Sequence, residues 1–135
     1  MKAKFPAMIA FFAAIGFMAF VPKTFVQQKP WPVPDAFKNK VNPLKGDAGS
    51  ITTGKDLYNQ HCKSCHGTKG KGDGPKASQL DTECGDFTKA TFQSQTDGAL
   101  FYKTSEGRDD MPSYKKKIPD ANDIWAIVNY LRTLK

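Results

Sequence analysis

The chain has 135 residues, of which 39% are hydrophobic and 24% are charged, and its formal net charge is +7. This length predicts one folded domain. The charge is uneven: residues 1–49 hold seven lysines and two aspartates, whereas residues 50–135 hold thirteen Lys or Arg and eleven Asp or Glu. The folded part therefore lacks a basic stripe with interleaved aromatics, and we expect no nucleic-acid partner. Three cysteines are an odd number, and too few for a disulfide scaffold.

The chain begins with an apolar run at residues 5–21, "FPAMIAFFAAIGFMAFV", which contains no charge and follows Lys2 and Lys4. A positive start and an apolar run are typical of an export segment. The run reaches the lower end of the membrane-spanning range of about 17–25 residues, and no Ala-x-Ala-like cleavage site ends it. We expect residues 1–21 to be a membrane anchor that holds the rest of the chain on the periplasmic side. The alternative is a cleaved signal peptide, which would leave a soluble periplasmic protein.

Residues 22–49 contain five prolines, and the stretch "KPWPVP" within them can form neither a helix nor a central strand. The composition predicts an extended, semi-rigid linker. In the alternative interpretation, the side chains of Trp31, Val33 and Phe37 pack on a partner or on the folded domain.

Two helices are expected at the start and middle of the folded region. The first covers residues 50–62 and begins at Ser50 as its N-cap. The second covers residues 96–107, with Thr96 as its N-cap and Gly107 as its stop.

A third helix is the clearest, covers residues 120–135 and has Asp120 as its N-cap. Its apolar residues recur at helical spacing and predict a buried face: Ile124, Ile127, Val128, Leu131 and Leu134. Long polar loops connect the helices, and no alternating strand pattern is present. An all-α domain over residues 50–135 would have little core of its own, so we expect something else to fill its centre.

The residues Cys62, Cys65 and His66 form a C-x-x-C-H motif, the attachment pattern for c-type haem. Two thiols at this spacing can each form a thioether to one vinyl group of a porphyrin. The histidine after the second thiol then lies beneath the iron as an axial ligand. One alternative is a zinc site drawn from His61, Cys62, Cys65, His66 and Cys84, although structural zinc sites usually use two well-separated ligand pairs. The other is a redox dithiol, which would need a strand–helix setting.

The second axial ligand of such a haem can be chosen by elimination. Past the N-terminal segment, the chain has one methionine, Met111, in the loop "GRDDMPSYKKK". The remaining histidine, His61, directly precedes Cys62 and belongs to the same side of the haem. We therefore expect Met111 to complete the coordination of the iron.

The segment 50–135 resembles the small mono-haem c-type cytochromes with histidine and methionine ligands. The resemblance rests on "GKDLYNQHCKSCHG", "KGDGP", "DDMPSY" and "DIWAIVNYLRTL". It is strongest to the short c domains of bacterial respiratory complexes, and it does not extend to residues 1–49. The resemblance implies an all-α cytochrome c fold, with three to five helices and long loops around one covalently bound haem c.

The resemblance also implies roles for individual residues. Cys62 and Cys65 would hold the haem, and His66 and Met111 would be the axial ligands of the iron. The carbonyl of Pro75 would accept a hydrogen bond from Nδ1 of the axial histidine.

Two further residues, Gly54 and Tyr130, would form a close crossing of the first and last helices, where a Cβ would collide with the aromatic ring. Cys84 has no role in the family pattern. We expect it to be a free thiol that is buried as a small apolar side chain, with an intermolecular disulfide as the alternative.

The functional expectation is an electron carrier, not an enzyme, that shuttles electrons between respiratory complexes such as a quinol-oxidising complex and a terminal oxidase. One alternative is a fixed subunit of a respiratory oxidase or dehydrogenase, and another is a haem sensor from which Met111 dissociates. The lysine run at residues 115–117 either steers an acidic redox partner or is a solvated surface run.

Overall fold

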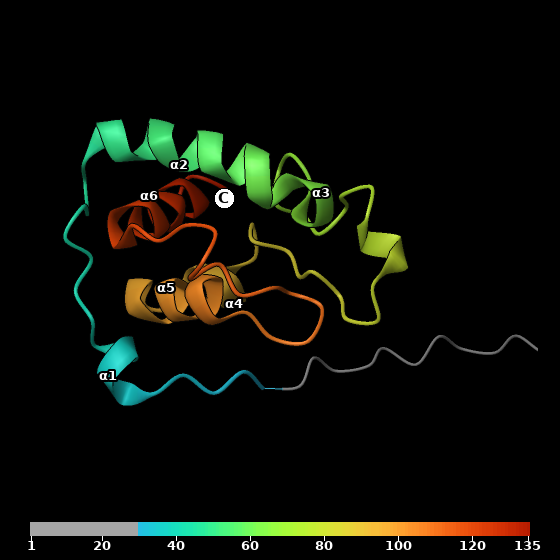
Figure 1. Cartoon of the computed structure of the whole chain (residues 1–135), viewed down its shortest axis with the longest axis horizontal. Coiled ribbons are helices and arrows are strands. Elements are labelled where there is room, and N and C mark those ends of the chain that lie inside the picture. The colour runs from blue at the N-terminus through green and yellow to red at the C-terminus, as the bar shows by residue number, and fades with distance from the viewer. Residues whose placement is uncertain (1–29) are drawn as a thin grey trace, which may run out of the picture.

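The computed structural model describes residues 30–135, and the expected anchor lies outside them. Within the described part, the chain forms helices and no strand, so the predicted all-α class is confirmed. The elements are α1 (Asp35–Lys38), α2 (Ala48–His61), α3 (Lys63–His66), the 3₁₀-helix η1 (Ala77–Gln79), α4 (Ala90–Gln93), α5 (Asp97–Glu106) and α6 (Ala121–Leu131) (Figure 1). The three long helices are the predicted ones, and the others are short turns. None of the helices in this part is long and apolar enough to cross a membrane.

Helix α2 begins two residues before the expected start, and its N-cap is Asp47, not Ser50. The Asp47 carboxylate accepts hydrogen bonds from the backbone N–H groups of Gly49 and Ser50, at 3.0 and 3.2 Å. Aspartate caps a helix as well as serine does. Ser50 is instead buried in the first turn, where its hydroxyl bonds the side chain of Asn129 at 2.7 Å.

The predicted start and end of α5 and the predicted start of α6 are confirmed, whereas α6 ends at Leu131 and not at Lys135. The Thr96 hydroxyl accepts a hydrogen bond from the N–H of Ala99, and Gly107 ends α5 with a φ of +69°. The Asp120 carboxylate accepts from the N–H of Asn122 at the start of α6. The predicted apolar face of α6 is buried from Ile124 to Leu131, and Leu134 packs partly against it.

The core lies between α2, α6 and α5, which are stacked in that order in Figure 1. Helix α6 is buried between the other two, and the Trp125 ring on it stacks on Phe101 of α5 with the ring centroids 4.3 Å apart. Tyr58, Leu100 and Val128 are among the most deeply buried side chains. A long loop between α3 and α4 lies at one end of the stack (Figure 1).

Residues 30–47, here called the strap, run along α5 and then climb to the start of α2 (Figure 1). Val33 is buried, and the Phe37 ring lies 4.8 Å from that of Tyr102 on α5. Of the two expectations for this segment, the structure therefore shows packing on the domain. A Cβ on Gly98 would lie 1.9 Å from the carbonyl oxygen of Phe37, so the strap touches the backbone of α5.

Candidate functional site

The C-x-x-C-H motif lies at the junction of α2 and α3. Cys62 is the C-cap of α2 and the N-cap of α3, and its N–H donates to the carbonyl of Tyr58 at 2.8 Å. The N–H of His66 donates to the Cys62 carbonyl at 2.9 Å. This nearly continuous helical turn brings both thiols and the imidazole to one cavity of about 500 Å³, a volume typical of cofactor sites.

Met111 lines the same cavity, although it follows His66 by 45 positions in the chain. A tight turn presents it: Arg108 and Met111 pair through two backbone hydrogen bonds of 2.8 and 2.9 Å, and Asp109 at the tip has a φ of +51°. Gly107 makes this turn possible, since a Cβ there would lie 2.4 Å from the Met111 carbonyl oxygen. The structure thus brings together the four residues that sequence reasoning selected as haem ligands and attachment points.

Apolar side chains form much of the cavity wall. They include Leu80, Phe87, Phe92, Leu100, Tyr114 and Leu131. The Phe87 ring lies 4.5 Å from the His66 ring and 4.4 Å from Phe92, so aromatic contacts hold the imidazole in place. An apolar cavity with a few converging polar groups suits a flat, largely apolar macrocycle.

Burial sets the protonation states in this cavity. It lowers the pKa of His66 to about 4, so the imidazole is neutral at neutral pH. It also raises the pKa of the Cys62 thiol to about 12, with a smaller contribution from Cys65. Nδ1 of His66 is buried and has no hydrogen-bond partner within the described residues. A neutral, buried imidazole beside two thiols in a largely apolar cavity fits a haem.

The hydrogen bond expected from His66 to the Pro75 carbonyl is not formed, because Nδ1 has no partner in the described part of the chain. Pro75 is exposed and lines a separate hollow, not the cavity that His66 lines. The loop around it is occupied with backbone pairing instead: the N–H of Gly74 donates to Cys65, and that of Lys76 donates to Ser64, at 3.1 and 2.9 Å. The role of Pro75 as an acceptor stays a prediction.

The close crossing of α2 and α6 is present at Gly54, but its cause differs from the expected one. A Cβ on Gly54 would lie 1.9 Å from the carbonyl oxygen of Ala126, so the backbone of α6, not the Tyr130 ring, excludes it. The Tyr130 ring packs on Tyr58, with centroids 5.1 Å apart. The Tyr58 hydroxyl in turn donates to the carbonyl of Gly67 at 2.6 Å, directly after the haem motif. Tyr130 therefore supports the motif through Tyr58.

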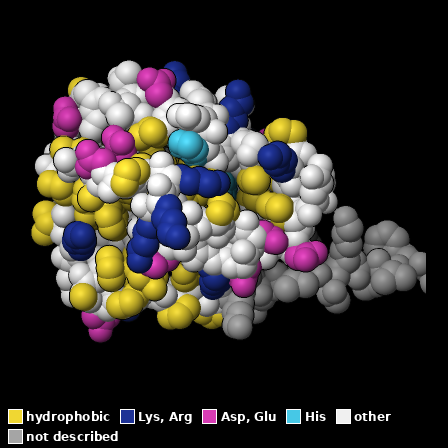
Figure 2. Space-filling view, viewed as in Figure 1, with side chains coloured by type: hydrophobic (Ala, Val, Ile, Leu, Met, Phe, Trp, Pro, Cys, Tyr) yellow, Lys and Arg dark blue, Asp and Glu magenta, His cyan; other side chains and the backbone are white. Residues whose placement is uncertain are grey.

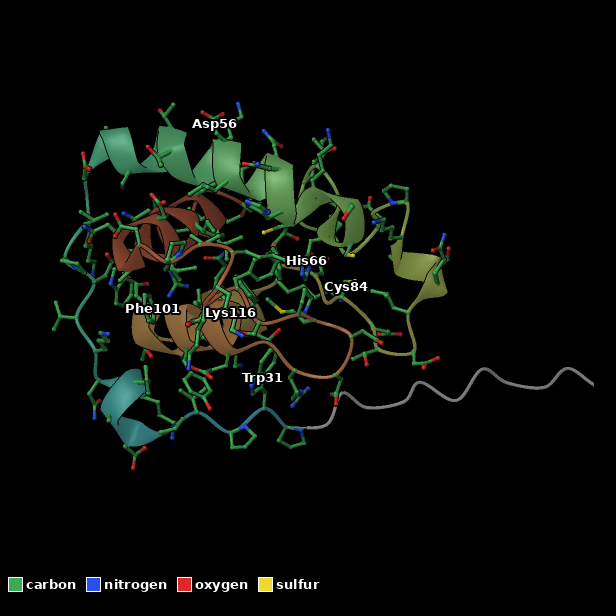
Figure 3. All side chains as sticks on the ribbon, viewed as in Figure 1. Trp31, Asp56, His66, Cys84, Phe101 and Lys116 are labelled. Carbon is green, nitrogen blue, oxygen red and sulfur yellow. The ribbon has the colours of Figure 1, made fainter. Side chains whose placement is uncertain are left out.

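Cys84 lies in the wall of the same cavity, which its sequence context did not indicate. It is half-buried and forms no disulfide with another cysteine of the described residues, and its expected role as a free thiol stays a prediction. Burial, and after it the neighbouring Cys65 thiol, raise the pKa of Cys84. A hydrogen bond with the backbone of Cys84 acts on the pKa of His66 in the opposite direction to burial, so this loop lies beside the imidazole (Figure 3).

The strap supplies one cavity residue, Trp31, that was considered only as a packing side chain. Two cations of the α5 end contact its ring: the Arg108 guanidinium carbon and the Lys103 ammonium lie 4.5 and 5.6 Å from the centroid. An aromatic residue among prolines was the one available signal in the sequence.

The zinc alternative finds no support in residues 30–135, where no group of three or more His, Cys, Asp or Glu side chains could hold a metal ion. His61 does line the cavity, but its carbonyl accepts a hydrogen bond from the Tyr114 hydroxyl at 2.7 Å and its ring packs edge-on against that of Tyr114. The strand–helix setting of a redox dithiol is also missing from this part of the chain.

Residues 49–131 match the protein-family model described as cytochrome c oxidase, cbb3-type, subunit III. A search of the curated proteins found no match. The match to the family model covers more than half of the chain, including the haem motif, the methionine loop and both long helices of the crossing.

Several solved structures are similar to the chain. The Kuenenia stuttgartiensis reducing HAO-like protein complex Kustc0457/Kustc0458 shares 27% identity at a TM-score of 0.63, over 79% of this chain and 51% of that one. The c-type cytochrome KustC0563 shares 30% identity at a TM-score of 0.54, over 61% of this chain and 96% of its own. Cytochrome cL from the marine methylotroph Methylophaga aminisulfidivorans shares the fold, at 21% identity and a TM-score of 0.55, over 85% and 71% of the two chains.

The present chain thus spans about half the length of the first of these similar chains and nearly all of the small cytochrome KustC0563. Because the family and these cytochromes carry haem c, the single C-x-x-C-H motif indicates one covalently bound haem here. The chain belongs to the family of cbb3-type cytochrome c oxidase subunit III, as an all-α c-type cytochrome domain with one covalent haem c.

Proposed function

We propose that this protein is an electron carrier whose haem is held by thioethers to Cys62 and Cys65 and ligated by His66 and Met111. The observation that carries this proposal is that all four side chains line one largely apolar cavity. When bound, haem c supplies an iron that alternates between two oxidation states. With a histidine and a methionine as ligands, no coordination site is left open for a substrate.

The residues of the chain would tune that redox step. A methionine ligand raises the reduction potential, and the apolar wall around Phe87 and Leu100 disfavours the more highly charged ferric state. The neutral imidazole of His66 is ready to bind a metal without first losing a proton. Together these features favour acceptance of electrons from a donor of moderate potential.

We further propose that residues 5–21 anchor the protein in a membrane with the haem domain on the periplasmic side. The uninterrupted apolar run after two lysines supports this, as does the need for haem attachment outside the cytoplasm. A cleaved segment would instead leave a soluble periplasmic carrier. Detection of the intact N-terminus in a membrane fraction by mass spectrometry would support the anchor.

The redox partners are other electron-transfer proteins, and we propose that the anchored domain shuttles between respiratory complexes. A fixed subunit of a respiratory enzyme is the second candidate, favoured by the family description as an oxidase subunit and by the similarity to a chain of a larger complex. Purification in mild detergent distinguishes the two: a subunit would co-purify in fixed stoichiometry, and a shuttle would elute alone. A haem sensor is a further candidate, in which Met111 would dissociate.

The ligand assignment is tested by the absorption spectrum of the holoprotein. The ferric protein is expected to show the weak red band of methionine–iron ligation, and Met111→Ala to lose this band and to have a lower reduction potential. His61→Gln is the matched control, because it changes the other candidate side chain in the cavity and should keep the band. A band that survives in Met111→Ala would refute Met111 as the ligand.

A further inference from the structure

The strap reaches the haem cavity although it precedes the matched family region. Trp31 lines the cavity together with Met111, whereas the family match begins at residue 49. Figure 3 shows Trp31 between the strap and the body of the domain. A segment outside the matched family region is therefore part of the wall of the site.

The contact between the strap and the cavity runs through Arg108. Its guanidinium carbon lies 4.5 Å from the centroid of the Trp31 ring, and its Nη1 donates a hydrogen bond to the carbonyl of Pro30 at 3.0 Å. Lys103 lies over the same ring at 5.6 Å. The strap thus binds the arginine side chain by a ring face and by a backbone acceptor at the same time.

Arg108 is also the direct backbone partner of Met111. Its N–H donates to the Met111 carbonyl at 2.8 Å, and its carbonyl accepts from the Met111 N–H at 2.9 Å. The backbone of Met111 and Pro112 also packs closely against Gly107, which leaves no room for a Cβ at that position. A force that holds the Arg108 side chain therefore also holds the backbone of Met111.

The far end of the strap is fixed independently. Asn42 is buried and donates to the side chain of Asn129 at 2.8 Å and to that of Asp97 at 3.1 Å. Asn129 donates in turn to the carbonyl of Leu44 at 2.6 Å. These bonds tie the strap to α5 and α6, so Trp31 is presented from a segment that is anchored on the rigid part of the fold.

We infer that the strap is a brace for the methionine loop, in which Trp31 is a positioning residue that keeps Met111 on the iron by clamping Arg108. This inference rests on the proposed role of Met111 as an axial ligand. The loop from 107 to 112 carries the ligand without a helix of its own, so its position depends on such neighbouring contacts. Loss of the brace should let the methionine leave the iron more often.

The test uses the full-length holoprotein and the variants Trp31→Ala, Trp31→Phe and Val41→Ala. Val41 belongs to the same strap but is 82% exposed, which makes its truncation a matched control. Trp31→Ala is expected to weaken the red band of the ferric protein. It should also raise carbon monoxide binding to the reduced protein by about two- to thirty-fold, the range equivalent to one lost cation–π contact. Trp31→Phe keeps an aromatic face and should restore most of both signals.

A second variant separates the brace from a general loss of structure. Arg108→Gln removes the clamped group and should give the same spectral change. Because both changes break the same contact between Trp31 and Arg108, the double variant with Trp31→Ala should be no worse than the stronger single variant. Additive effects, or a Trp31→Ala protein with the band and carbon monoxide binding of Val41→Ala, would overturn the inference while leaving Met111 as the ligand. If the unaltered protein lacks the band, the ligand assignment fails, and the brace fails with it.

Discussion

Gly54 lets α2 and α6 cross so closely that the space for a side chain is filled by backbone. The position of a Cβ there is 1.9 Å from the Ala126 oxygen and 2.9 Å from the Ile127 nitrogen. Both neighbours are backbone atoms, so a side chain at this position could be accommodated only if the two helices separated. The crossing also places Tyr130 on Tyr58, which holds the chain after the haem motif.

We predict that Gly54→Ala destabilises the holoprotein by at least about 3 kcal/mol, the upper end of the usual cost of overpacking. Gly49→Ala in the first turn of the same helix is the control. A Cβ at Gly49 would be 3.5 Å from the Asp47 side chain, an ordinary contact, and alanine should stabilise the helix by up to about 1 kcal/mol. Urea unfolding of both variants provides the measurement, and equal midpoints would contradict the close crossing.

At the scale of elements, the strap behaves as an additional layer of the fold. It lies on α5 through Phe37, and the Asn42 side chain donates hydrogen bonds to Asp97 of α5 and to Asn129 of α6. A buried amide left without its partner costs about 1–3 kcal/mol, so these bonds favour one register of the strap over any other. Arg132 extends the network, since its guanidinium donates to Asp97 at 2.7 and 2.9 Å.

We predict that Gly98→Ala detaches the strap without opening the crossing of α2 and α6. The new Cβ would meet the carbonyl oxygen of Phe37 at 1.9 Å, and an overpacking cost of about 1–3 kcal/mol corresponds to about five- to 150-fold more open strap. Trypsin cleavage after Lys38 and Lys40 should accelerate by that factor. Gly49→Ala serves again as the control. If Gly98→Ala were cleaved no faster than Gly49→Ala, the strap would not be packed tightly on α5.

At the scale of the whole molecule, Figure 2 shows Lys and Arg side chains spread over one face, some of them beside a histidine. The lysine run at 115–117 follows the methionine loop directly, and Lys116 projects from this region in Figure 3. Lys115 forms an ion pair with Glu106 at 2.6 Å, and Lys117 lies over the Tyr114 ring of the cavity wall. The run therefore places positive charge beside the cavity.

We predict that changing all three lysines of the run at 115–117 to glutamate slows electron transfer with an acidic redox protein. Steering by charge accelerates association by about 10- to 1,000-fold at low salt, so the loss should be at least tenfold there and should vanish at high ionic strength. The same change in net charge at Lys38, Lys45 and Lys55 is the control and should have a smaller effect. Equal slowing by both triple variants would mean that net charge alone matters, and stopped-flow kinetics distinguishes the two.

Local patterns predicted much of this molecule. The helical spacing of α6 and the caps at Thr96 and Asp120 depend on residues within one or two turns of each other, and the structure confirms them. The haem motif is equally local, and the family match supports it. Elimination among the methionines was enough to select Met111, because the chain has so few candidates past its N-terminal segment. The N-cap of α2 was misassigned because Asp47 and Ser50 are both good caps and lie three residues apart.

The sequence by itself determined the C-x-x-C-H motif, which together with the family match indicates one covalent haem, and it predicted Met111 as the second ligand. Only the tertiary structure decided which backbone excludes a side chain at Gly54, that Cys84 lies in the cavity wall, and that Trp31 reaches the methionine loop. The physical reason is how far apart in the sequence the interacting residues lie. Motifs, caps and helical faces arise from neighbours along the chain, whereas the strap and the crossing join segments about 70 to 90 residues apart through contacts that no local pattern encodes.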